Sequence, residues 1–126
     1  MSAWTAEELA AIAVADELRI APRRADGTLR RAVTIWVVRH GDDLYVRSAR
    51  GRDGAWYRGT QVRHEGHVES GGVARDVRFT DEPDPALNEE IDREFRTKYR
   101  GYREEFVDPM VTAPARATTL KVLPAG

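Results

Sequence analysis

The chain has 126 residues, of which 41% are hydrophobic and 33% are charged, and its formal net charge is -1. This length and apolar content suit one core, so we expect a single domain over residues 1–126. The near-zero net charge argues against a nucleic-acid-binding domain, which usually carries a large positive excess. Because the chain has no cysteine, disulfides and cysteine-ligated zinc are excluded.

The sequence also argues against insertion into a membrane. Its longest apolar stretch, residues 9–15, is mostly alanine and falls far short of the roughly 20 residues that cross a bilayer. Glu7 and Glu8 precede this stretch, where a secretory signal would carry positive charge. We therefore expect a cytoplasmic protein without a membrane partner.

The beginning of the chain predicts a helix followed by a β-hairpin. Thr5 and Glu8 have the spacing of a capping box, so a helix should begin at Thr5 and end near Val14. A first strand of alternating pattern follows around Leu18. Asp26-Gly27 then supplies residues that tolerate positive φ in a hairpin turn.

The middle of the chain predicts a second hairpin and a short helix. Residues 31–39 are β-branched and aromatic on both faces, which predicts a central strand of a sheet or barrel. After a turn, residues 44–47 alternate in character and form the next strand. The loop 49–54 is rich in glycine and arginine, and Asp53 should cap a helix over residues 55–63.

The last part of the chain predicts a third hairpin, a long helix and a closing strand. Gly71-Gly72 should join two strands, and Asp84-Pro85 is a strong helix start. The helix carries an apolar stripe with a spacing of four residues, formed by Leu87, Ile91, Phe95 and Tyr99. A final strand spans 118–123. The fold class is therefore α+β, mainly β, with an antiparallel barrel and flanking helices.

The loop 49–54 and the residues after it have the chemistry of an anion-binding corner. Gly51 and Gly54 let backbone N–H groups approach a phosphate, and arginine offers it paired hydrogen bonds. The short helix points its positive end the same way. The adjacent Trp56 and Tyr57 could wall a pocket for a planar ring. The alternative is an exposed arginine loop, with both aromatic side chains anchoring the helix in the core.

Three segments carry a motif pattern: Leu-Tyr-Val-Arg-Ser-Ala-Arg-Gly at 44–51, Ala-Trp-Tyr-Arg at 55–58 and Gly-Gly at 71–72. Together they resemble the deazaflavin-dependent nitroreductase branch of the flavin-binding, pyridoxamine-phosphate-oxidase-like split β-barrels. Within that branch the chain resembles a family of small bacterial proteins. The resemblance implies an antiparallel split β-barrel with flanking helices.

The resemblance also implies a phosphorylated cofactor, FMN or the deazaflavin coenzyme, bound at the interface of a homodimer. The positions that match the relatives' motif are Ser48, Arg50, Gly51, Trp56 and Tyr57. For an oxidoreductase of this kind we also expect Arg47 to help hold the phosphate. Thr34 joins these candidates if its face of the strand lines the pocket, where its hydroxyl would bond a ring edge; otherwise it belongs to the core. We expect Arg52 to be a solvated bystander.

The chain departs from the relatives' pattern at two points. Arg50 replaces a lysine, and Gln61-Val62-Arg63-His64 replaces the Asn-Pro that normally follows the short helix. These departures leave the choice of cofactor open. Two alternatives follow: a chain that still binds its cofactor, and a chain that keeps the barrel fold without binding one.

Two functions of different classes follow from these observations. In a flavin- or deazaflavin-dependent oxidoreductase the cofactor carries the hydride, so no catalytic side chain need appear in the sequence. The alternative is a non-catalytic binding module for haem or another small anionic ligand. His64-Glu65-Gly66-His67 lacks the spacing of a helical zinc motif, so we expect no metal site.

Overall fold

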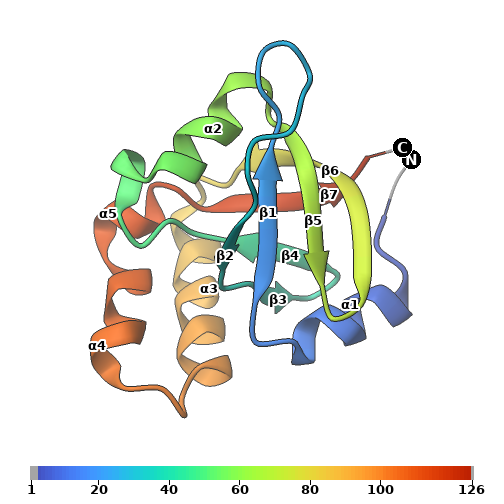
Figure 1. The fold of residues 1–126 in the computed structure, drawn as a ribbon. Helices are drawn as coiled ribbons and strands as arrows, with labels where there is room; N and C mark the ends of the chain where they lie inside the picture. Colours follow the sequence, from blue (N-terminus) through green and yellow to red (C-terminus); the bar gives the residue numbers. More distant parts are fainter. Residues whose placement is uncertain (1–2, 126) are drawn as a thin grey trace.

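The computed structural model describes residues 3–125, and its centre is one seven-stranded antiparallel sheet (Figure 1). The strand order is β2-β1-β5-β6-β7-β4-β3. The strands are β1 (Leu18–Pro22), β2 (Val33–Ile35), β3 (Val38–His40), β4 (Asp43–Val46), β5 (Glu65–Ser70), β6 (Val73–Asp81) and β7 (Leu120–Pro124). The helical elements are α1 (Ala6–Val14), η1 (Gly51–Asp53), α2 (Ala55–Arg63), α3 (Pro85–Lys98), α4 (Glu104–Val107), η2 (Asp108–Val111) and α5 (Ala113–Arg116).

The sequence prediction of a single central strand over residues 31–39 is wrong. The segment forms two short strands, β2 and β3, which lie at the two opposite edges of the sheet order. Trp36 and Val37 join them, so the chain crosses from one edge of the sheet to the other and curls the sheet into a split barrel. The strand breaks here because Val37 bonds to Tyr99 and Lys98 of α3, where a ladder partner would otherwise stand.

The predicted helices are confirmed, with one correction at a cap. Thr5 caps α1 and forms both halves of a capping box with Glu8. Asp84 caps α3 by accepting a hydrogen bond from the Ala86 backbone N–H. Helix α2 has the expected bounds, but its N-cap is Gly54 and not Asp53, so no side chain caps it.

Two apolar cores lie on the two faces of the sheet. The first contains alternate residues of the strands, such as Leu44 and Val46 of β4, together with Leu9 of α1. The second lies between the sheet and α3, where Tyr45 meets the predicted stripe of that helix. Strand β4 is therefore buried on both faces. Arg47 follows two residues after Tyr45, points to the same face of the sheet, and so lies beneath α3.

The final hairpin and strand are confirmed, with a shift of bounds. Strands β5 and β6 pair around Gly71-Gly72 as expected. The last strand runs from Leu120 to Pro124, and Thr118 and Thr119 precede it as buried side chains. Among the helices of residues 3–125, none combines the length and the apolarity that a membrane span requires.

Candidate functional site

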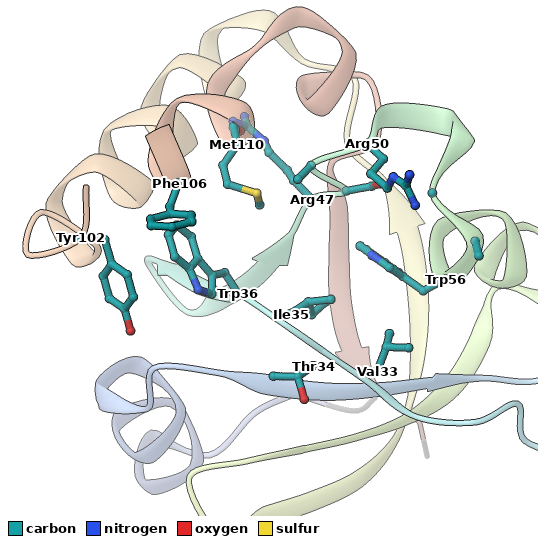
Figure 2. Close-up of a pocket in the computed structure, with 14 residues that line it drawn as sticks. Val33, Thr34, Ile35, Trp36, Arg47, Arg50, Trp56, Tyr102, Phe106 and Met110 are labelled. Atoms are coloured by element: carbon teal, nitrogen blue, oxygen red, sulfur yellow. The ribbon is translucent and has the colours of Figure 1, made fainter. Parts of the chain in front are cut away.

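A cavity of about 610 Å³ opens beside the crossover between β2 and β3 (Figure 2). Its wall combines the β2 segment, the end of β4, the start of α2 and the helical segment before α5. The lining residues are Val33, Thr34, Ile35, Trp36, Arg47, Ser48, Ala49, Arg50, Gly54, Ala55, Trp56, Tyr102, Phe106 and Met110. The sequence-predicted Thr34, Arg47, Ser48, Arg50 and Trp56 are thus brought together.

The cavity has an apolar end and a polar end. Figure 2 shows Trp36, Tyr102, Phe106 and Met110 gathered on one side, and Arg50 with Trp56 on the other. No lining residue is acidic. A ligand that fits both ends is therefore elongated, with an anionic group at the Arg50 end and an apolar or aromatic body.

Ser48 is the most informative residue of the polar end. Its side chain is only 1% exposed, and its Oγ has no hydrogen-bond partner within the described residues. Its backbone N–H is already committed to Thr118 Oγ1 at 2.8 Å. Burying a hydroxyl without a partner costs free energy, so the Oγ of Ser48 is a polar atom of this wall whose hydrogen bonding the described residues leave unmet.

Two further features beside Ser48 favour an anion. Gly54 caps α2 without a side chain, so the first N–H groups of that nine-residue helix have no side-chain partner at the cap. A Cβ at Gly54 would collide with Ser48 Oγ, so glycine is required for the hydroxyl to occupy this corner. Arg50 lines the cavity from an exposed position.

Arg47 does not have the role that the sequence suggested. Its side chain is buried, and all five guanidinium N–H donors have partners. Nε donates to Thr119 Oγ1 at 2.9 Å, Nη1 to Asp92 Oδ1 and to the Met110 carbonyl at 3.0 Å, and Nη2 to the Asn88 carbonyl at 3.0 Å and its Oδ1 at 2.8 Å. No donor is left for a phosphate.

The partners of Arg47 explain its burial. Desolvation lowers the pKa of Arg47, and the hydrogen bond to Asp92 opposes this shift. Asp92 also accepts hydrogen bonds from Arg116, whose pKa it raises. The guanidinium of Arg47 lies 5.5 Å from the centre of the Phe95 ring. Arg47 therefore ties the end of β4 to α3 and to η2, and so fixes two walls of the cavity.

A stack of aromatic rings makes the apolar end rigid. Trp36 lies flat against Tyr99, with ring centres 3.8 Å apart and planes inclined by 4°. Tyr102 packs against Trp36 in a T-shaped arrangement, with the two ring centres 5.1 Å apart. The Tyr99 hydroxyl is fixed in turn by the backbone of Asp16 and Val37. Desolvation raises the pKa of Tyr99, so it remains a neutral donor at ordinary pH.

Two predicted site residues do not line this cavity. Tyr57 lines a separate cavity on the other side of α2, because adjacent helical residues point about 100° apart. Gly51 is buried against Pro114 with φ +65°, so it shapes the loop without facing the cavity. The helical period places the side chains of Trp56 and Tyr57 in different directions around α2, and in this structure they line different cavities.

Sequence reasoning missed the residues that close the apolar end. Tyr102, Phe106 and Met110 lie in the segment between α3 and α5, which the sequence left as a connection. Their spacing of four residues is a weak helical signal that could have drawn attention to them. These three residues lie far along the sequence from the loop 49–54, so no local motif links them to that loop.

The histidines lie away from this cavity. His40 bonds to Glu94 and faces Glu90 on α3, and His67 bonds to Asp76. His64 ends α2 in the left-handed conformation. None of the three lines the cavity, and residues 3–125 contain no cluster of three or more histidine, aspartate or glutamate side chains that could hold a metal ion.

Solved structures of other proteins share this fold. A candidate pyridoxamine 5'-phosphate oxidase from Listeria innocua superposes with a TM-score of 0.62 at 13% identity, covering 94% of this chain and 90% of the other. A FAD-binding protein from Mesorhizobium loti gives 0.61 at 16%, covering 98% and 91%. An F420-H2 dependent reductase gives 0.58 at 14%, covering 86% and 93%.

These likenesses confirm the predicted fold, the split β-barrel of pyridoxamine-phosphate-oxidase-like proteins, which includes F420-dependent reductases. No curated protein sequence matches the chain. A family model does match it, over residues 8–122. The chain therefore belongs to the bacterial family described as "Uncharacterized protein conserved in bacteria (DUF2255)".

Proposed function

We propose that the protein binds a phosphorylated flavin-type cofactor, FMN or the deazaflavin coenzyme, in the 610 Å³ cavity and acts as an oxidoreductase. The observation that carries this proposal is the buried, unpartnered Ser48 Oγ beside the cavity. Proteins of the same fold are described as a FAD-binding protein and an F420-H2 dependent reductase, which supports a cofactor of this class.

The phosphate is held at the polar end by three kinds of donor. Ser48 Oγ donates one hydrogen bond, and the Arg50 guanidinium approaches from the exposed side with two donors and a positive charge. The uncapped start of α2 supplies backbone N–H groups and the positive end of its dipole. Arg47 contributes indirectly, because it ties the chain next to Ser48 to Thr119 and to Asn88 of α3.

The ring system lies toward the apolar end, between Trp56 and Trp36 (Figure 2). Apolar walls of this kind exclude water and orient a planar ring, while a few polar groups fix its register. Thr34 is positioned on β2 to bond a ring edge through its hydroxyl. When bound, the cofactor supplies the hydride chemistry, and the chain's own residues bind and orient it.

A second copy of the chain completes the site in this proposal. The cavity mouth carries large apolar side chains that are unusually exposed: Phe106 at 58%, Tyr102 at 43% and Val33 at 39%. Burying such a patch against an identical patch is the ordinary basis of a symmetric dimer. Sedimentation should show a dimer, and Phe106→Glu should dissociate it, because the change places a charge at the interface.

A non-catalytic module for haem or another anionic ligand is the competing function. Haem binding would be favoured by histidines near the pocket, and the cavity lining contains none. Another anionic ligand would use the same Ser48 and Arg50 donors. Turnover separates the two functions: with a reductant and an electron acceptor supplied, an oxidoreductase oxidises the reduced cofactor faster than the free cofactor reacts with the same acceptor, whereas a binding module does not.

The proposal is tested by the visible absorbance of the purified protein and by fluorescence titration. FMN, riboflavin and the deazaflavin coenzyme are titrated in parallel. We expect one phosphorylated cofactor to bind at micromolar concentration or better, and riboflavin to bind more weakly because it lacks the phosphate. A colourless protein that quenches none of them at micromolar concentration would contradict the proposal.

A further inference from the structure

Thr118 lies between α5 and β7, and its side chain is fully buried. Its Oγ1 accepts a hydrogen bond from the Ser48 backbone N–H at 2.8 Å and donates one to the Ala115 carbonyl at 2.7 Å. A threonine hydroxyl has one hydrogen to donate, so the bond to Ala115 leaves its lone pairs to the Ser48 N–H. This hydroxyl therefore joins the end of α5 to a residue that lines the cavity.

The bond to Ser48 stands where the backbone pairing of β4 and β7 stops. The last pair in the register is Val46 with Leu120, and Ser48 and Thr118 lie two residues beyond it on the two chain segments. In place of a further backbone bond, the side chain of Thr118 holds the Ser48 N–H. Without this hydroxyl, the buried N–H would have no partner among the described residues, and such a donor costs free energy.

The other groups of Ser48 are constrained as well. Its carbonyl accepts a hydrogen bond from the Gly51 N–H at 3.0 Å. A Cβ on Gly54 would collide with Ser48 Oγ, so the chain at Gly54 limits the rotation of the hydroxyl on that side. Once the backbone is fixed, a single torsion angle decides where Oγ lies. The unpartnered Oγ is thus held at a definite place in the cavity wall.

We infer that Thr118 is a positioning residue, which fixes Ser48 Oγ for the phosphate of a bound cofactor. The inference rests on the proposed function and extends it to a residue that does not line the cavity itself. Thr118 acts only through the Ser48 backbone. A hydroxyl that is fixed in advance binds a phosphate more tightly than a mobile one, because less conformational freedom is lost on binding.

The affinity test uses Thr118→Val, which keeps the branched shape of the side chain and removes the hydroxyl. FMN affinity should fall about fivefold, as far as in Ser48→Ala, because the serine hydroxyl no longer meets the phosphate. Riboflavin lacks the phosphate and should bind within about twofold of wild type, and Thr118→Ser, which restores the hydroxyl, should bind FMN equally well. Equal losses for FMN and riboflavin, or no rescue by Thr118→Ser, would overturn the inference.

Thr60→Val is the matched control. Thr60 is also fully buried, and its Oγ1 donates to the Tyr57 carbonyl three residues earlier, just as Thr118 donates to Ala115. It does not line the cavity, and it has no hydrogen bond to Ser48. Both valine variants should lose stability in urea, but Thr60→Val should keep the FMN affinity of wild type. A loss as large as that of Thr118→Val would contradict a positioning role.

A double-mutant cycle separates positioning from general damage to the fold. In the Ser48→Ala protein there is no hydroxyl left to place, so adding Thr118→Val should cost less than about twofold in FMN affinity. An undiminished loss in that background would count against the inference. Thr118→Ala is measured in parallel, because its smaller side chain puts no extra methyl group against the Ser48 N–H. It should give the same result, so the test stands even if Thr118→Val does not fold.

Amide hydrogen exchange of the unliganded protein tests the anchor without any cofactor. The Ser48 N–H should exchange at least about tenfold faster in Thr118→Val than in wild type, whereas Thr60→Val should leave its rate unchanged. Equal rates in wild type and Thr118→Val would overturn the inference. If wild type binds neither FMN nor the deazaflavin coenzyme, and Thr118→Val still frees the Ser48 N–H, the proposed function fails while the anchoring of Ser48 by Thr118 stands.

Discussion

Arg47 and Arg50 both follow strand β4, within four residues of its end, yet their surroundings give them different tasks. Arg47 is 1% exposed and spends all its donors on α3, η2 and Thr119. Arg50 is exposed, lines the cavity and forms no ion pair within the described residues. An arginine near a pocket holds the scaffold when its donors are used, and its donors are available to a ligand only when they are free.

The comparison is tested most strongly by removing Arg47. Arg47→Ala leaves several buried acceptors without their donors and deletes half of a buried ion pair, so the free energy of unfolding should fall by about 3–5 kcal/mol. Urea denaturation measures this loss. A change below about 1 kcal/mol, together with lost FMN binding, would show that Arg47 contacts ligand and that the assignment is inverted.

Removing Arg50 should have the opposite effect: a large loss of FMN affinity and almost no change in stability. Arg50→Ala deletes an exposed side chain, so unfolding should change by no more than about 0.5 kcal/mol. Affinity for FMN should fall by about 1.5–3 kcal/mol, because charge-assisted bonds to the phosphate are lost. Riboflavin affinity should not change. Arg52→Ala is the matched control, since Arg52 is also exposed but lines the separate cavity beside Tyr57, and it should leave FMN binding intact.

Lys98 extends the comparison to a partly buried cation that can lose its proton. Its Nζ donates to the Val37 carbonyl at 2.7 Å, and burial lowers its pKa from 10.5 to about 8, with Asp16 opposing the shift. Between these two pH values the unfolded chain binds the proton and the folded chain does not, so stability rises with pH.

For Lys98 we expect the difference in unfolding free energy between wild type and Lys98→Met to change with pH. Wild type should gain about 1–2 kcal/mol of unfolding free energy relative to Lys98→Met between pH 8 and pH 10.5. The gain is smaller than the full pKa shift would give, because the amine is only partly buried and solvent screens its charge. Denaturation curves at the two pH values measure it. A constant difference would mean that the lysine titrates normally.

The smallest expected effect concerns the unpartnered hydroxyl of Ser48. Ser48→Ala removes a buried polar atom that has no bond to lose, so stability should be unchanged or higher by about 1 kcal/mol. FMN affinity should fall about fivefold, the value of one hydrogen bond. Differential scanning calorimetry measures the stability of this variant, and the same fluorescence titration measures its FMN affinity. A clear loss of stability would show that Ser48 Oγ serves the fold alone.

Local signals predicted much of the fold. The Thr5 capping box and the Asp84-Pro85 start lie within a few residues of the helices they begin, and both are confirmed. The strand over 31–39 failed because its interruption depends on Tyr99 and Lys98, about 60 residues away, which the pattern of β-branched residues cannot report. Tertiary partners override propensity at such a point.

The cofactor-binding role of the candidate residues stays a prediction, and the structure shows only which of them line one cavity. The segment from β4 to α2 does line the cavity, as the motif pattern indicated. The burial of Arg47 depends on Asp92 and Asn88 of α3, which no spacing near Arg47 reveals. By contrast, the different facing of Trp56 and Tyr57 follows from the helical period and was predictable.

The most direct test of the central claim is a crystal structure of the protein soaked or grown with FMN. We predict phosphate oxygens at about 2.6–3.2 Å from Ser48 Oγ and from the Arg50 guanidinium, with the ring system between Trp36 and Trp56. Arg47 should keep its contacts to Asp92 and Asn88 unchanged. A phosphate bound elsewhere, for example by Arg52 and Arg116, with Ser48 Oγ still unpartnered, would contradict the account.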